Sequence, residues 1–146
     1  MKKYFLVLPF LIISLLGCRE RPYRSFVYVN ITYENLNYLN SIWQSVSDFK
    51  KEDSSEICTW YTTQLKETKY PVGVTGCIDP PEQSWTNALA YSVTGQMSPH
   101  HADSEEHFKM AKQELDALME KIRQAIEKEL GREVKKRSHD YLQPII

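Results

Sequence analysis

One short stretch of this 146-residue chain concentrates side chains that bind metal ions. Imidazole and carboxylate groups occur there within eight positions: His100, His101, Asp103, Glu105, Glu106 and His107. Such groups are ligands for zinc and other divalent metals. However, a histidine doublet followed by five residues and a third histidine matches no spacing that directs three ligands at one ion. We interpret the cluster as solvated polar residues, with weak metal binding as the alternative, and predict no metal and no cofactor.

No other group of residues carries a catalytic signature. The chain contains no GxSxG or HExxH motif, and its few glycines form no phosphate-binding loop. Paired carboxylates occur only where the sequence pattern predicts a solvated helix surface. We therefore predict that the protein is not an enzyme and that it acts by binding.

The composition is typical of one small globular domain, with 42% hydrophobic and 25% charged residues. The formal net charge is −1, so no general basic field attracts nucleic acid. A local basic run, Lys135-Lys136-Arg137, is interpreted as an exposed turn near the C-terminus. Contact with a membrane surface or an anionic glycan is the alternative for this run. We expect no nucleic acid among the partners.

The N-terminus has the features of a secretory leader. Residues 4–16 are apolar except for Ser14, and they follow Lys2-Lys3. These 13 residues are too few for a membrane-spanning helix, which needs roughly 20, but they match the apolar core of a signal peptide. Leu15-Leu16-Gly17-Cys18 then resembles the lipobox of bacterial lipoprotein precursors. The resemblance implies cleavage after Gly17, a diacylglycerol thioether on Cys18 and acylation of the new amine; an ordinary cleaved signal peptide and a retained anchor are the alternatives.

The same resemblance implies a location. In lipoproteins of enteric-type bacteria, Asp directly after the lipidated cysteine favours retention in the inner membrane, and most other residues permit export to the outer membrane. Here that residue is Arg19. We therefore expect a lipid-anchored protein of the bacterial cell envelope that faces the periplasm, at the outer membrane in preference to the inner one. Two or three acyl chains would hold it firmly there.

Two cysteines besides Cys18 remain in the mature chain, Cys58 and Cys77. An even number of cysteines in an oxidising compartment indicates a disulfide, and two separate buried thiols are the alternative. A zinc site is not expected, because the chain has no CxxC motif and no histidine near either cysteine. A disulfide that closes a loop of about 20 residues contributes roughly 3 kcal/mol by its effect on the unfolded chain.

The first third of the mature chain shows a helical spacing of apolar residues. After Thr32, a good helix N-cap, they recur mostly three positions apart: Leu36, Leu39, Ile42, Trp43, Val46 and Phe49. A polar turn at residues 50–55 leads to a second apolar series: Ile57, Cys58, Trp60, Tyr61 and Leu65. The pattern predicts a helical hairpin. Residues 26–31 before it are β-branched and aromatic, which fits a short strand or the start of a helix.

The middle segment, residues 70–103, is rich in residues that interrupt regular structure: Pro71, Gly73, Gly76, Pro80, Pro81, Gly95 and Pro99. We expect an irregular segment here. A bridge from Cys77 to Cys58 would tie it to the helical hairpin.

Residues 104–130 give the clearest helical pattern. Acidic residues follow Ser104, and Gly131 stands at a position where helices commonly end. The apolar stripe of this helix includes Phe108, Leu115, Leu118 and Ile122. Such a stripe is a core face, or in part a seam for a partner helix or a second copy of the chain. These four residues are therefore our candidate interaction residues, and self-association is an open option.

Together the patterns predict a mainly α fold. It comprises a helical hairpin, an irregular disulfide-tied middle segment, a long C-terminal amphipathic helix and at most one short strand pair. We assign residues 1–17 to a lipoprotein signal peptide, residues 18–25 to the lipidated N-terminus and a short linker, and residues 26–146 to a single small globular domain.

Two functions fit a small, lipid-anchored protein without catalytic groups. The first is an accessory component of a secretion or conjugation apparatus, or a lipoprotein that excludes further copies of a mobile element. The alternative is a periplasmic immunity or inhibitor lipoprotein directed against a toxin or a hydrolase. Both act by protein–protein contact, for which aromatic residues serve well. The partner itself is not specified by the sequence.

Overall fold

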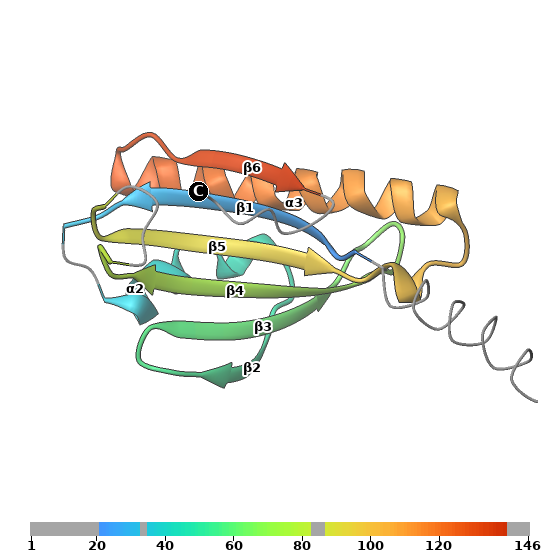
Figure 1. The fold of residues 1–146 in the computed structure, drawn as a ribbon, viewed down its shortest axis with the longest axis horizontal. Helices are drawn as coiled ribbons and strands as arrows, with labels where there is room; N and C mark the ends of the chain where they lie inside the picture. The colour runs from blue at the N-terminus through green and yellow to red at the C-terminus, as the bar shows by residue number, and fades with distance from the viewer. Residues whose placement is uncertain (1–20, 33–34, 83–86, 140–146) are drawn as a thin grey trace, which may run out of the picture.

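The computed structural model describes residues 21–32, 35–82 and 87–139. In this part of the chain, six strands and one long helix form two layers (Figure 1). The strands are β1 (Tyr23–Asn30), β2 (Lys50–Ser54), β3 (Cys58–Gln64), β4 (Pro71–Asp79), β5 (Ala90–Met97) and β6 (Lys135–His139). The helices are α2 (Leu36–Ser41) and α3 (Glu105–Leu130), with the short 3-10 helices η1 (Gln44–Val46) and η2 (Pro99–His101).

Neighbouring strands are antiparallel throughout the sheet, in the order β2-β3-β4-β5-β1-β6. The N-terminal strand β1 therefore lies between β5 and β6, from the C-terminal half of the chain. α3 runs along one face of the sheet, and α2 packs on the same side against β4 (Figure 1). We call the opposite side the open face, since no helix of the described residues covers it.

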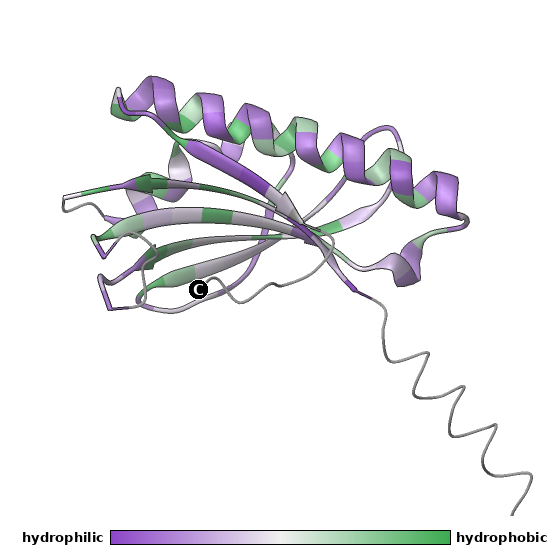
Figure 2. Ribbon diagram, turned by 45° about the horizontal axis from the view of Figure 1, so that its top comes forward, coloured by the Kyte–Doolittle hydropathy of each residue, from purple (hydrophilic) through white to green (hydrophobic). Residues whose placement is uncertain are grey.

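Alternation along the strands places one set of side chains under α3. Val74 of β4 and Val93 of β5 are fully buried there. They meet the apolar side of α3, whose alternating green and purple segments in Figure 2 are those of an amphipathic helix. The buried residues of α3 are Ala111, Leu115, Leu118, Met119, Ile122 and Ile126. Burial of each large apolar side chain contributes about 1.5 to 3 kcal/mol, so this layer is a major contribution to the stability.

α3 is the element that the sequence predicted correctly. Ser104 caps its N-terminus by accepting a hydrogen bond from the backbone N–H of His107 at 3.0 Å. Gly131 ends the helix with a left-handed backbone (φ 63°), and its N–H donates to the carbonyl oxygen of Glu127. Glycine adopts this conformation without steric cost, which is why it marks helix ends.

One carboxylate fastens the turn between β3 and β4 to α3. Glu114 accepts hydrogen bonds from the backbone N–H groups of Glu67 (2.7 Å) and Thr68 (3.0 Å), and from the Thr68 hydroxyl (2.6 Å). Partial burial raises the pKa of this carboxyl, but the hydrogen bonds together outweigh burial and hold the pKa below its ordinary value. The ionised carboxylate therefore stabilises the turn fully when the pH is above the ordinary pKa of glutamate. This stabilisation is lost as the pH falls through the lowered pKa.

The prediction of a mainly α fold is wrong, because a six-stranded sheet forms most of the domain. The predicted helical hairpin is absent: its first helix is reduced to α2 and η1, the polar turn predicted at residues 50–55 forms β2, and its second helix is replaced by β3. The segment after Leu39 contains asparagine and serine, which are poor helix formers. Threonine and aromatic residues dominate β3, and these side chains fit a pleated strand better than a helix.

The prediction of an irregular middle segment with at most one strand pair is also wrong. This segment contains β4 and β5, two central strands of the sheet. Pro71 is the first residue of β4, a position where proline is tolerated in a sheet. Gly95 faces α3, where a Cβ would lie 2.9 Å from both Leu115 Cδ1 and Met119 Sδ. This glycine therefore permits close packing of the helix on the sheet.

Candidate binding face on the open side of the sheet

The open face gathers the side chains that alternate with the buried set. In β3, Thr59 and Tyr61 are buried under the helical layer, so the residues that alternate with them point to the opposite side. The same alternation applies to β4 and β5. The outward positions in the middle of these three strands are Cys58, Trp60, Thr62, Gly73, Thr75, Cys77, Ser92, Thr94 and Gln96.

A hollow of about 480 Å³ lies on this face across β3, β4 and β5 and reaches η2. Its volume is in the range of small-ligand sites, but it is open to solvent on one side. The residues that define its shape and chemistry are Trp60, Thr62, Gly73, Thr75, Thr94 and Gln96. We call this set the open-face hollow.

Trp60 and Gly73 give the hollow its shape. The Trp60 side chain is 40% exposed and stands directly opposite Thr75 of the neighbouring strand. Gly73 lies opposite Thr62 on one side and Gln96 on the other. A Cβ at Gly73 would meet no atom within 4 Å, so the space above this position is open. The hollow is therefore bordered by the Trp60 ring, and at Gly73 its base has no side chain.

The chemistry of the hollow suits binding. Its hydroxyl and amide groups donate and accept hydrogen bonds without carrying charge. His101 at the rim is the one titratable side chain among the described residues that line it, and none of these residues is Asp, Glu, Lys or Arg. The described lining residues therefore provide no carboxylate with which His101 could form an acid–base pair. The site is therefore a surface without Asp, Glu, Lys or Arg, and Trp60 is its main apolar contact residue.

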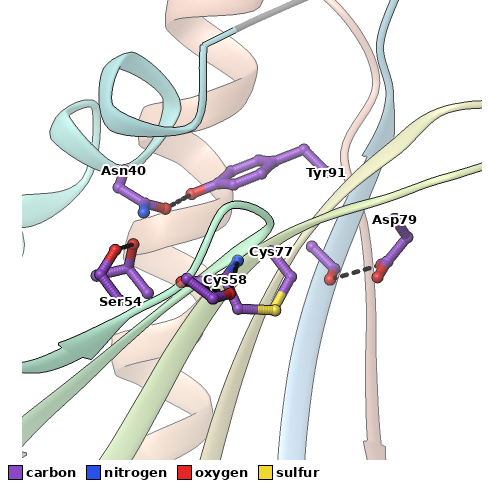
Figure 3. The surroundings of a disulfide bond; sticks show 9 residues. Asn40, Ser54, Cys58, Cys77, Asp79 and Tyr91 are labelled. Carbon is purple, nitrogen blue, oxygen red and sulfur yellow. Dashed lines mark hydrogen bonds between the residues drawn. A yellow bond between two sulfur atoms is a disulfide. The ribbon is translucent and has the colours of Figure 1, made fainter.

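The disulfide predicted between Cys58 and Cys77 is confirmed (Figure 3). The two residues are directly opposite each other in β3 and β4, with their Cα atoms 4.2 Å apart. The next outward pair along these strands is Trp60 and Thr75. The covalent link thus joins the two strands immediately beside the tryptophan of the open-face hollow.

A buried hydrogen-bond chain supports the same strands from the helical side. The indole N–H of Trp43 donates to the Tyr91 hydroxyl oxygen at 2.7 Å. The Tyr91 hydroxyl in turn donates to Asn40 Oδ1 at 2.5 Å (Figure 3). Burial raises the pKa of Tyr91, so its hydroxyl keeps the proton that it donates. Gly76 leaves room for this chain, because a Cβ there would lie 2.1 Å from Asn40 Oδ1.

The structure does not assemble the three histidines into a metal site. Both ring nitrogens of His107 are engaged: Nδ1 accepts from the backbone N–H of Asp103 (3.1 Å), and Nε2 lies 2.9 Å from the Thr68 carbonyl oxygen. His100 and His101 are in η2, where the His101 ring meets the edge of the Tyr70 ring. Within the described ranges, no three potential ligands are close enough to hold one metal ion.

The predicted interaction stripe lies in the core. Leu115 and Ile122 are fully buried, Leu118 is 9% exposed, and Phe108 is half-buried against the same cluster. Of the two interpretations of this stripe, burial supports the core face. The apolar residues of α3 that were expected to contact a partner helix pack against the sheet of the same chain.

The remaining predicted residues lie at the two ends of the chain. Cys18 and the leader are outside the described residues, in which no helix is long and apolar enough to cross a membrane. The basic run at Lys135-Lys136-Arg137 forms most of β6 instead of a turn. Lys136 Nζ donates to the Asp116 carbonyl oxygen at 2.9 Å, and the Arg137 guanidinium lies over the Tyr28 ring.

Trp60 was not among the residues predicted to form a site. The helical interpretation of residues 55–65 counted it as part of a buried stripe. The signal that identifies it is the alternation around it, because Thr59 and Tyr61 on either side are buried while Trp60 points outward. Read with a period of two, the same residues predict an exposed tryptophan beside a cysteine.

Comparison with known proteins gives little further information. No protein family and no curated protein matches the chain. Among solved structures, the uncharacterized conserved protein YugN from Geobacillus kaustophilus HTA426 is similar, with a TM-score of 0.36 and 14% sequence identity. The similarity covers 68% of this chain and 89% of that one.

Proposed function

We propose that this protein is a lipid-anchored binding protein of the bacterial envelope and that it contacts a protein partner through the open face of its sheet. The observation that carries the proposal is the exposed Trp60 beside an uncharged hollow. An exposed tryptophan next to a recess is the arrangement found at energetic centres of protein interfaces. The lipobox resemblance at Leu15-Leu16-Gly17-Cys18 supports the anchor.

The partner that we propose is a component of an envelope machine for secretion or conjugation, to which this protein is an accessory or which it blocks as an exclusion lipoprotein. Crosslinking and pull-down from intact envelopes tests the choice. Recovery of secretion or transfer components supports it. Recovery of a single toxin or hydrolase would contradict it and assign the protein to the immunity or inhibitor class.

The anchor is tested by Cys18→Ser. We expect the wild-type protein to incorporate labelled palmitate and to sediment with membranes, and the variant to do neither, because the thioether requires the Cys18 sulfur. The measurement is metabolic labelling together with membrane fractionation. The anchor interpretation is wrong if the wild type takes up no label and the variant still sediments with membranes.

The contact surface is tested by Trp60→Ala. We expect at least a tenfold loss of recovered partner in the crosslinking experiment, because truncation of an interface tryptophan costs about 2 kcal/mol or more. Tyr38→Ala is the matched control: Tyr38 is a comparably exposed aromatic residue (43%), but it lies on α2, on the helical side of the sheet. Equal recovery with the two variants would exclude the open face as the contact surface, provided that both melt near the wild-type temperature.

A further inference from the structure

We propose that one end of the domain lies against the headgroup surface of the bilayer that holds the lipid. This inference rests on the proposed anchor at Cys18. The end in question, which we call the anchor end, consists of the start of β1, η2 and the first two turns of α3. Tyr23 at the start of β1 pairs with Met97, which is two residues before η2, so these segments are neighbours (Figure 1).

The length of the tether restricts the domain. Cys18 lies three residues before Arg21, where the described chain begins, and five residues before Tyr23 in β1. A fully extended chain spans at most about 3.5 Å per residue, so Tyr23 is held within about 18 Å of the lipidated residue. α3, with its 26 residues, is about 39 Å long. The tether is thus less than half as long as the domain, and the anchor end stays close to the bilayer.

The anchor end has side chains suited to a headgroup layer. Met110 in the second turn of α3 is 50% exposed, more than the other exposed large apolar residues in the described ranges. Lys109 beside it is exposed and can reach lipid phosphates. Acidic side chains also lie at this end, at Asp103, Glu105 and Glu106. Because the anchor end carries both cations and anions, its electrostatic attraction to anionic lipid is weak. The contact between the anchor end and the bilayer is therefore enforced by the short tether.

This placement also locates the open-face hollow. Gln96 pairs with Gly73 on one side and with Arg24, the second residue of β1, on the other. The hollow therefore begins at the level of the sheet where the tether enters it. A partner that fills the hollow must come close to the membrane surface, whereas the turn that follows α3 at Gly131 lies at the far end of the helix.

Two lysines on one helix provide the test. Lys109 and Lys128 are both exposed on α3, and they are 19 positions apart, which corresponds to about 28 Å along the helix. Lys109→Cys and Lys128→Cys are each labelled with the same fluorophore on the full-length lipidated protein, under conditions that keep the Cys58–Cys77 disulfide. The proteins are reconstituted into phosphatidylethanolamine and phosphatidylglycerol vesicles that contain a lipid with a nitroxide headgroup, and quenching is measured.

We expect quenching at position 109 to be several-fold stronger than at position 128. Equal quenching, or stronger quenching at position 128, in protein that floats with the vesicles overturns the orientation and leaves the anchor intact. Protein that does not float with the vesicles overturns the anchor, and the inference with it. The Cys18→Ser form is expected to remain unbound by the same vesicles, and its binding would show that affinity, rather than the tether, makes the contact.

Discussion

Gly76→Ala is expected to destabilise the protein by about 3 kcal/mol, the upper end of what overpacking of a well-packed core costs. The added methyl group would lie 2.1 Å from Asn40 Oδ1 and 3.1 Å from the Tyr91 hydroxyl oxygen. Both atoms belong to the buried hydrogen-bond chain with Trp43. Asn40 must then move, which leaves the Tyr91 hydroxyl without its acceptor in a buried site. Urea denaturation followed by circular dichroism measures the change.

Gly73→Ala is the matched control, because this glycine is in the same strand and its Cβ would meet nothing within 4 Å. We expect it to change the free energy of unfolding by less than about 0.5 kcal/mol. A second variant, Asn40→Ala combined with Gly76→Ala, removes the clashing oxygen and should cost less than the sum of the two single changes. Equal stability of Gly76→Ala and Gly73→Ala would show that the buried hydrogen bonds of Asn40 and Tyr91 do not require a glycine at position 76.

Removal of the disulfide should have an effect of similar size. We expect the double variant Cys58→Ser, Cys77→Ser to lose about 3 kcal/mol of unfolding free energy, because the bridge closes a loop of about 20 residues and restricts the unfolded chain. The two cysteines are 19 positions apart and lie in adjacent strands. Chemical denaturation of wild type and variant, with and without reductant, measures this difference.

Thr75→Ser serves as the control for a polar change on the open face, and we expect it to be nearly neutral. Reductant should lower the unfolding midpoint of the wild type and of Thr75→Ser but leave the double variant unchanged. If reductant leaves the wild-type midpoint unchanged as well, the bridge contributes nothing to stability and the strand pairing alone holds this part of the sheet.

The C-terminal helix was predictable because its signals are local. Ser104, the acidic first turn and Gly131 specify its ends, and each acts within one turn of the chain. Among the strands, β1 corresponds to the short strand that was one of two alternatives for residues 26–31. The strands within residues 36–65 were not predicted, because several apolar residues there fit two periods. Tyr61 and Leu65 are four residues apart, which suits a helix, but both are also buried in the sheet structure. A buried threonine, Thr59, conceals the alternation, since it counts as polar in a hydrophobic pattern.

The candidate site was predictable only in part. The pairing of Cys58 with Cys77 follows from their number, whereas the position of Trp60 beside them depends on strand register. The glycines of β4 were interpreted as breakers of structure. Their actual roles differ, since Gly76 accommodates a buried amide and Gly73 leaves the hollow open. Both roles depend on residues that are distant in the sequence, so a local sequence pattern cannot predict them.

The position of β1 within the sheet affects when this domain can fold. Val27 of β1 pairs with Val93 of β5 on one side and with Lys136 of β6 on the other, so both partners are synthesised long after it. Contacts between residues so distant in sequence form slowly, because the chain must close large loops first. The β1 strand has both of its neighbours only when nearly the whole chain is present. On the proposed export of this chain to the envelope, β1 would therefore gain its last partner, β6, only when passage is nearly complete.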